Sequence, residues 1–92
     1  MMYRNSNQIA ESILQSVSES GMDGIKTTQL LHKSNLSHGR LKTFVSKLVQ
    51  SNLINKIEVK NKTIFIITEN GRVYLDEYRK FSDLVDSFGL EL

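Results

Sequence analysis

The sequence predicts a mainly α-helical domain with one small β-hairpin, which is an α+β fold. Three observations predict it. Apolar residues recur at helical spacing in four stretches, and turn residues separate these stretches. Two β-rich runs flank a short polar turn in the second half of the chain. The chain has 92 residues and no cysteine, so a single domain without a disulfide framework is expected.

The first helix is expected over Ser6–Ser20. Asn5 or Ser6 can cap its N-terminus, with Gln8 completing a capping box, and Gly21 ends it. Its apolar face has four aliphatic residues at helical spacing, namely Ile9, Ile13, Leu14 and Val17. The remaining faces are rich in Ser, Gln and Glu, which bind phosphate poorly, so this helix has a structural role.

A turn and a short helix follow. Gly21–Gly24 is the turn, and Ile25 is placed to make a short strand contact. Thr27 is the expected N-cap of a second helix over Thr28–Lys33. That helix buries two leucines, Leu30 and Leu31.

The stretch Asn35–Ile54 contains a third, amphipathic helix. Ser34–Leu36 is too short for a free loop, so it joins the second and third helices through a tight turn, the spacing of a helix-turn-helix. Ser37 is the expected N-cap, and Asn52 ends the helix. The apolar face comprises Leu41, Phe44, Val45 and Leu48, with Val49 at its margin.

The opposite face of the third helix is small and polar at its centre and cationic at its edges. At about 100° per residue, Gly39, Thr43, Ser46 and Gln50 form the central strip. The flanking cations are Arg40, Lys42 and Lys47. Small polar groups can approach base edges while cations reach phosphates, so this face suits the major groove of double-stranded DNA. The alternative is an ordinary amphipathic surface helix.

A β-hairpin is expected over Lys56–Val59 and Thr63–Ile67. Its basic tip consists of Lys60, Asn61 and Lys62, which can contact phosphates or probe the minor groove. The second run is apolar throughout from Ile64 to Ile67, so at least one outward side chain there must be covered. A helix-turn-helix followed by a hairpin is a winged helix-turn-helix.

The last helix begins after Thr68, its expected N-cap, and ends near Gly89. Its N-terminal half is expected to pack on the first helix through Val73 and Leu75. Its second half extends beyond the core and is expected to pair with a second copy of the chain. The apolar seam has heptad spacing and is widened by Leu75 and Leu84; its members are Tyr74, Tyr78, Phe81, Val85, Phe88 and Leu92. Residues 1–68 are thus the expected winged-helix DNA-binding domain, and 69–92 a dimerisation helix of the same compact unit.

Charge is segregated along the chain. Residues 24–68 carry eight bases and one acid, which gives 8 − 1 = +7. Residues 69–92 carry three bases and six acids, which gives 3 − 6 = −3. This asymmetry favours polyanion binding by residues 24–68 and another role for residues 69–92. Ordinary surface lysine is the alternative interpretation.

The sequence shows no catalytic constellation, so an enzyme is not expected. No cofactor, metal, membrane partner or small-molecule substrate is indicated, because His32 and His38 lack further ligands and no apolar run could span a bilayer. A cytoplasmic, nucleoid-associated protein is expected. Two alternatives to a regulator stay open: a non-specific architectural DNA-binding protein, and a winged helix used for protein–protein contact. The latter would need an apolar patch on the third helix or wing, and the sequence indicates none.

Several short segments occur in the order seen in small archaeal winged-helix DNA-binding proteins that dimerise through a C-terminal antiparallel coiled coil. These segments are Asn35-Leu36-Ser37, Leu53-Ile54, Ile67-Thr68-Glu69-Asn70-Gly71 and Arg79-Lys80-Phe81. The chain resembles this family from about Ile9 to Phe88. The last helix is shorter here, since Gly89 lies near its end. Viruses and plasmids of crenarchaea use such domains too.

The resemblance implies double-stranded DNA binding by a homodimer, with a regulatory or chromatin-shaping role. The contacts carried over by position are Ser37, His38, Arg40, Lys42, Thr43, Ser46, Lys47 and Lys60–Lys62. A transcriptional regulator is the main expectation. The central strip of the third helix has few long side chains for bidentate base contacts, so this helix is expected to position the protein more than to specify a sequence.

Overall fold

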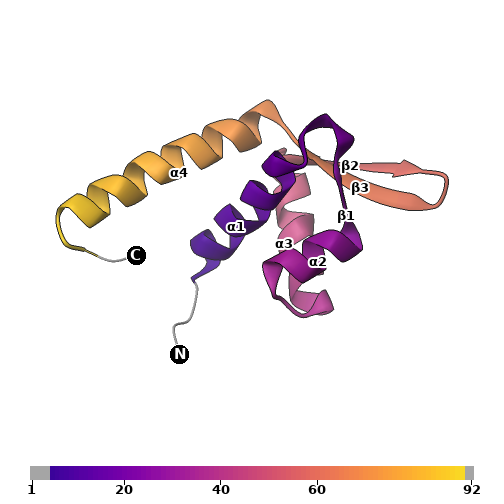
Figure 1. The fold of residues 1–92 in the computed structure, drawn as a ribbon, viewed down its shortest axis with the longest axis horizontal. Helices are drawn as coiled ribbons and strands as arrows, with labels where there is room; N and C mark the ends of the chain where they lie inside the picture. The colour runs from indigo at the N-terminus through magenta and orange to yellow at the C-terminus, as the bar shows by residue number, and fades with distance from the viewer. Residues whose placement is uncertain (1–4, 91–92) are drawn as a thin grey trace.

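Three helices pack beside a small antiparallel sheet, and a fourth helix extends away from them (Figure 1). The computed structural model describes residues 5–90. Its elements are α1 (Ser6–Glu19), the 3₁₀ turn η1 (Gly21–Asp23), β1 (Ile25–Lys26), α2 (Thr27–Ser34), α3 (His38–Gln50), β2 (Ile54–Val59), β3 (Lys62–Ile67) and α4 (Glu69–Ser87). This arrangement confirms the predicted α+β winged helix-turn-helix.

A single core lies between α1, α2, α3 and the sheet. The predicted apolar faces of α1 and α3 are confirmed, since Ile13 and Leu14 are fully buried and Leu41 is 2% exposed. The Asn5–Gln8 capping box of α1 also forms, with the Asn5 Oδ1 atom accepting from the Gln8 N–H at 2.8 Å. Periodicity alone therefore located the buried faces of these helices.

The sheet has the order β1-β3-β2, so β3 is its central strand. Ile25 in β1 pairs with Phe65, and Ile54 in β2 pairs with Ile67. Strand β2 therefore begins two residues before the predicted Lys56, because backbone pairing continues to the end of β3. The hairpin turns at Lys60 and Asn61, both with positive φ (48° and 66°), as a two-residue type I′ turn requires.

The outward side of β3 is covered, as the apolar run predicted. Phe65 and Ile67 are buried, whereas Ile64 and Ile66 are half-buried on the other side of the strand. The chain before β1 crosses that side closely: a Cβ on Gly24 would lie 3.1 Å from the Ile64 Cδ1 atom, and Gly24 has a φ of +79°. Glycine is needed there for space and for backbone conformation.

The predicted start of the second helix is wrong by one residue. Helix α2 begins at Thr27, and Lys26 occupies the N-cap position with extended backbone. The reason is that Lys26 also pairs with Ile64 in the sheet, so the strand runs directly into the helix. The Gln29 side chain accepts from the Lys26 N–H at 3.1 Å, and Thr27 makes no cap.

The beginning of α4 is bound to the loop that leaves α3. The Thr68 hydroxyl donates to the Asn52 carbonyl at 2.7 Å and accepts from the Gly71 N–H at 3.0 Å, which confirms Thr68 as the N-cap. The Thr68 N–H donates to the Leu53 carbonyl at 3.1 Å. Gly71 is buried at this junction. A larger residue would not fit, because a Cβ would overlap the Leu53 carbonyl oxygen and lie 2.7 Å from the Ile67 Cγ1 atom.

The apolar residues of α4 differ in how far the rest of the molecule covers them. Leu75 is 3% exposed and packs in the core, but Val73 is 52% exposed, so the predicted packing of Val73 on α1 is wrong. Residues two apart differ by about 200° around a helix, and Gly71 and Leu75 fix which side faces inward. Three apolar side chains of α4 are exposed, namely Val73, Phe81 and Leu84, and Phe88, the C-cap of the helix, is exposed as well.

The inward face of α4 has a pair of tyrosines. The rings of Tyr74 and Tyr78 stack with centroids 6.3 Å apart. Burial, then the Glu11 carboxylate of α1, then Tyr74 raise the pKa of Tyr78, so its hydroxyl stays protonated. The inward face thus belongs to the α1 contact.

Gly89 ends α4, as predicted. Its φ is +72°, its N–H donates to the Asp86 carbonyl at 3.0 Å, and the Leu90 N–H donates to the Val85 carbonyl at 3.0 Å. This pair of bonds is the Schellman motif. Leu92, the last residue of the predicted seam, lies outside the described residues. None of the helices within residues 5–90, α4 included, has the length and apolar character needed to cross a membrane.

Candidate nucleic-acid interface

Helix α3 is held between two tight turns. Asn35, with a φ of +55°, ends α2, and the Ser37 hydroxyl then accepts from the Arg40 N–H at 3.3 Å, which confirms the predicted cap. At the other end Asn52 has a φ of +60° and leads the chain into β2. The orientation of α3 is therefore set by short connections on both sides.

The outward face of α3 brings together the residues predicted for it. All of them are exposed, namely Ser37, His38, Gly39, Arg40, Lys42, Thr43, Ser46, Lys47 and Gln50. Arg40, Lys42 and Lys47 make no ion pair with any residue in the described part of the chain. Their charges are thus available to a polyanion.

The structure shows which groups of the Thr43 side chain remain available for contacts with DNA. Its hydroxyl donates to the Gly39 carbonyl at 3.0 Å, one turn earlier in α3. The hydroxyl proton is therefore used within the helix, and Thr43 presents its acceptor lone pairs and its methyl group outward. Such a methyl group can contact the methyl of thymine in the major groove.

The hairpin projects beyond α3 and ends in the predicted basic tip (Figure 1). Lys60, Asn61 and Lys62 are all exposed. Lower in the hairpin, the Lys56 Nζ atom lies 3.5 Å from the Glu58 Oε1 atom. The acid of the hairpin is thus paired on its own strand, and the tip remains cationic.

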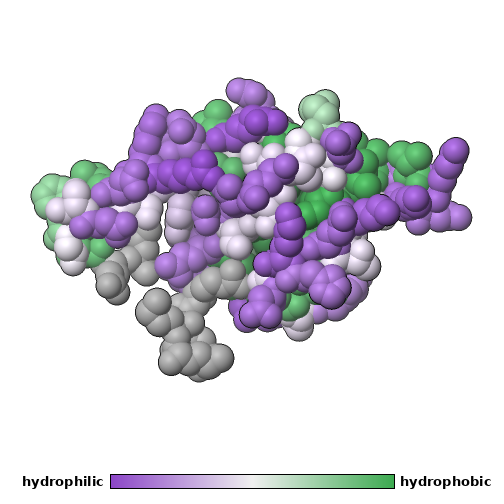
Figure 2. Space-filling view, viewed as in Figure 1, coloured by the Kyte–Doolittle hydropathy of each residue, from purple (hydrophilic) through white to green (hydrophobic). Residues whose placement is uncertain are grey.

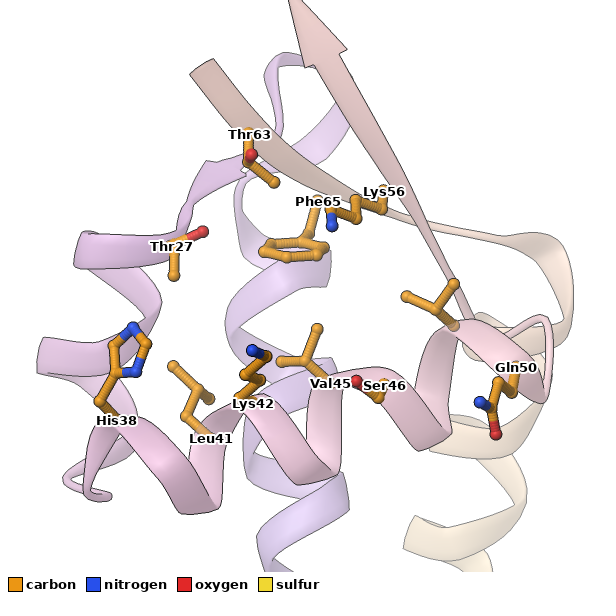
Figure 3. Close-up of a pocket in the computed structure, with 11 residues that line it drawn as sticks. Thr27, His38, Leu41, Lys42, Val45, Ser46, Gln50, Lys56, Thr63 and Phe65 are labelled. Atoms are coloured by element: carbon orange, nitrogen blue, oxygen red, sulfur yellow. The ribbon is translucent and has the colours of Figure 1, made fainter. Parts of the chain in front are cut away.

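A groove of about 400 Å³ separates α3 from the hairpin (Figure 3). We call it the α3–hairpin groove; it is lined by Thr27, His38, Leu41, Lys42, Val45, Ser46, Val49, Gln50, Lys56, Thr63 and Phe65. Thr27, Lys56 and Thr63 were not predicted as site residues. Alternation in β2 places Lys56 on one face with Ile54, but only the observed register puts it opposite Phe65.

Apolar exposure on the wing was underestimated from the sequence. Val59 is 51% exposed near the hairpin tip, because the turn at Lys60–Asn61 leaves nothing to cover it. Figure 2 shows green surface along the hairpin and purple surface at its tip. The large exposed hydrophobic residues include none from α3, as expected.

Helix α4 has more acids than bases, and its lysine is paired within the helix. Lys80 lies 3.2 Å from the Asp76 carboxylate and 3.5 Å from that of Glu77. The hydrogen bond to Asp76, followed by the charges of both acids, raises the pKa of Lys80. Figure 2 shows green surface at the far end of α4. The exposed apolar residues in the C-terminal half of α4 and at its cap are Phe81, Leu84 and Phe88.

Comparison with solved structures finds the same fold in several proteins. The DNA-binding protein Sso10a-2 from Sulfolobus solfataricus matches with a TM-score of 0.77 and 16% identity, over 92% of this chain and 85% of that one. AF1382 from Archaeoglobus fulgidus matches with a TM-score of 0.70 and 15% identity, over 83% and 86%. The transcriptional regulator BldR from Sulfolobus solfataricus matches with a TM-score of 0.71 and 24% identity, over 87% of this chain but only 58% of that one.

At these identities the structural likeness concerns the fold. A comparison with curated protein sequences gives no match. The family model described as winged helix-turn-helix, however, matches residues 3–86, which is most of the chain. The observed helix-turn-helix, hairpin and last helix all lie within that span or end beside it. The chain therefore belongs to the winged helix-turn-helix family.

Proposed function

We propose that this protein is a double-stranded DNA-binding transcriptional regulator that acts as a homodimer in the cytoplasm. Helix α3 enters the major groove, and the hairpin tip contacts the adjacent backbone. One observation carries the proposal: the outward face of α3 combines a small polar strip with Arg40, Lys42 and Lys47, which form no ion pair with any acid of residues 5–90. Cations at both edges contact phosphates, and the strip between them faces the base edges.

The structural neighbours support the DNA-binding part of the proposal. Sso10a-2 is described as a DNA-binding protein, and BldR as a transcriptional regulator. A winged helix used only for protein contact is less well supported. Val59 is a single exposed apolar residue on the wing, and isolated residues of this kind are normal on protein surfaces.

Binding to DNA is tested by gel-shift titration at low salt, with a mixed pool of duplexes. Selection of bound duplexes from a random pool then separates the two DNA-binding roles. A consensus with two half-sites marks a regulator and reports the dimer geometry, whereas the absence of a consensus marks an architectural protein. If no duplex binds at low salt, the proposal is wrong.

Removing a charge from the wing tip should weaken binding to every sequence about equally. Lys62→Ala deletes a phosphate contact and should make the slope of log K against log salt shallower by about one. Ser46→Ala, in the central strip, should instead change the relative affinity for different duplexes. Affinities for the selected duplex and a scrambled one, measured for both variants, check this. A selective loss for Lys62→Ala would place the tip in the base-reading part of the interface instead.

Dimerisation is proposed to occur through the exposed apolar face of α4. Phe81 is 54% exposed and Phe88 is 73% exposed, so more than half of each side chain is accessible to a second copy. Phe81→Asp should give a monomer in sedimentation, because a buried interface would leave the new carboxylate unpaired. Arg79→Asp, which places the same side chain on the opposite face of α4, should leave the dimer intact. An unchanged mass for Phe81→Asp would exclude this face as the interface.

A further inference from the structure

The side chain of Thr43 is held in place by helix α3 itself. Its hydroxyl donates to the Gly39 carbonyl at 3.0 Å, one turn earlier in the helix. Thr43 is exposed and does not line the α3–hairpin groove, so its side chain is open to solvent. Because the hydroxyl proton is bonded within the helix, the side chain offers an external partner only its methyl group and the lone pairs of its oxygen.

Thr43 also lies at the centre of the α3 cations that the proposed function assigns to phosphates. At about 100° per residue, Lys42 lies about 100° to one side of Thr43 around α3. Lys47 and Arg40 lie about 40° and about 60° to the other side. Along the axis, at about 1.5 Å per residue, Arg40 precedes Thr43 by about 4.5 Å and Lys47 follows it by about 6 Å. When these cations contact phosphates on both walls of the major groove, Thr43 lies over the base edges between them.

A methyl group beside an oxygen acceptor suits one base pair better than the others. Thymine presents a methyl group in the major groove, and the adenine paired with it presents an amino donor. Guanine presents only acceptors on that edge, and the Thr43 hydroxyl has no free proton to donate to them. Cytosine has an amino donor but no methyl group. The groups that Thr43 leaves available therefore favour an A·T pair.

We propose that Thr43 is a specificity-determining residue that recognises thymine through contact between the two methyl groups. The inference rests on the proposed function, because it requires the outward face of α3 to lie in the major groove. It adds a base preference to that function, namely one thymine methyl group against Thr43 in each half-site. Removing the contact should weaken binding about fourfold per half-site, as expected for one buried methyl group. This modest effect agrees with a helix that has few long side chains for bidentate base contacts.

Deoxyuridine tests the contact from the side of the DNA, because it pairs like thymidine and lacks only the methyl group. Duplexes that the full chain selects from a random pool are synthesised again with deoxyuridine in place of every thymidine. This works whether or not the selected duplexes share a consensus. In gel-shift titrations the deoxyuridine set should bind at least about fourfold more weakly than the thymidine set. Equal binding of the two sets would overturn the proposal.

Two variants assign the preference to the methyl group of Thr43. Thr43→Ser keeps the hydroxyl and deletes only the methyl group, so it should bind the two sets of duplexes equally. Thr43→Val deletes the hydroxyl and keeps a methyl group, so it should retain the preference for thymidine. Lys47→Gln, an exposed cation on the next turn, is the matched control and should weaken binding to both sets by the same factor. A preference that persists in Thr43→Ser would mean that another residue contacts thymine, and the proposal would be wrong.

The same measurements separate this inference from the proposed function. If the unaltered chain binds no duplex at low salt, the proposed function fails and the thymine contact fails with it. If duplexes bind but deoxyuridine has no effect, only the thymine contact fails. A loss of about fourfold or more that Thr43→Ser abolishes, and Thr43→Val retains, supports both.

Discussion

Raising the salt concentration from about 50 mM to about 200 mM should weaken duplex binding by about 10³- to 10⁵-fold. Each protomer presents five cations that the proposal assigns to phosphates, namely Arg40, Lys42, Lys47, Lys60 and Lys62. Each engaged contact contributes about −0.9 to the slope of log K against log salt, so a dimer that engages all of them gives a slope of about −9. Gel-shift or anisotropy titrations at four salt concentrations measure this slope.

The monomeric variant provides the control for this result. If Phe81→Asp separates the protomers, its slope should be about half that of the dimer, because one set of cations is engaged. An unchanged slope would mean that one protomer makes all the phosphate contacts. A slope shallower than about −2 in the unaltered protein would exclude the proposed arrangement of α3 and the wing tip on phosphates.

Replacing Gly71 with alanine should cause the largest loss of stability among the glycine variants. The new Cβ would overlap the Leu53 carbonyl oxygen and lie 2.7 Å from the Ile67 Cγ1 atom. Overpacking usually costs about 1–3 kcal/mol, and we expect about 3 kcal/mol here because a backbone carbonyl cannot rotate away. In a domain of this size that lowers the midpoint of thermal unfolding by roughly 12–24 °C.

Gly39→Ala is the matched control for this prediction. Gly39 is also helical, but a Cβ there would meet nothing within 4 Å. Because alanine favours a helix over glycine, this variant should be more stable by up to about 1 kcal/mol. Thermal unfolding followed by circular dichroism, at one fixed protein concentration, compares the two variants. Equal stability of Gly71→Ala and the unaltered protein would mean that α4 does not approach Leu53 this closely.

The close approach at Gly71 also connects the two functional parts of the molecule. The Thr68 hydroxyl donates to the Asn52 carbonyl in the loop that leaves α3, and it caps α4 by accepting from the Gly71 N–H. The helix proposed to read DNA and the helix proposed to pair the protomers therefore meet in one hydrogen-bonded junction. Gly71→Ala variants that remain folded should change the preferred half-site spacing, which the duplex selection would report.

Local sequence patterns were enough to predict the buried faces and the ends of several helices. The inward faces of α1 and α3 follow from apolar residues at helical spacing, and the caps at Asn5, Ser37 and Thr68 follow from side chains that accept a backbone N–H. The strip and cations on the outward face of α3 follow from the same spacing. The end of α4 at Gly89 was predictable too, since only a residue tolerant of positive φ closes a helix in this way.

Other features depend on contacts between segments that are distant in the sequence. The heptad pattern of α4 looked like one seam, but packing on α1 buries Leu75 and leaves Val73 and Phe81 exposed. The pattern could not show this division because it records spacing and not which side a neighbouring helix covers. The start of α2 moved for a similar reason, since Lys26 is held by β3.

The sequence by itself determined that the chain is a winged helix-turn-helix with a cationic third helix and a basic hairpin tip. These properties depend on periodicity, capping and charge, which are local. Only the tertiary structure decided that Lys56 and Phe65 face α3 across a groove, and which face of α4 remains free. Those facts depend on strand register and helix rotation, which are fixed by close packing of the whole core.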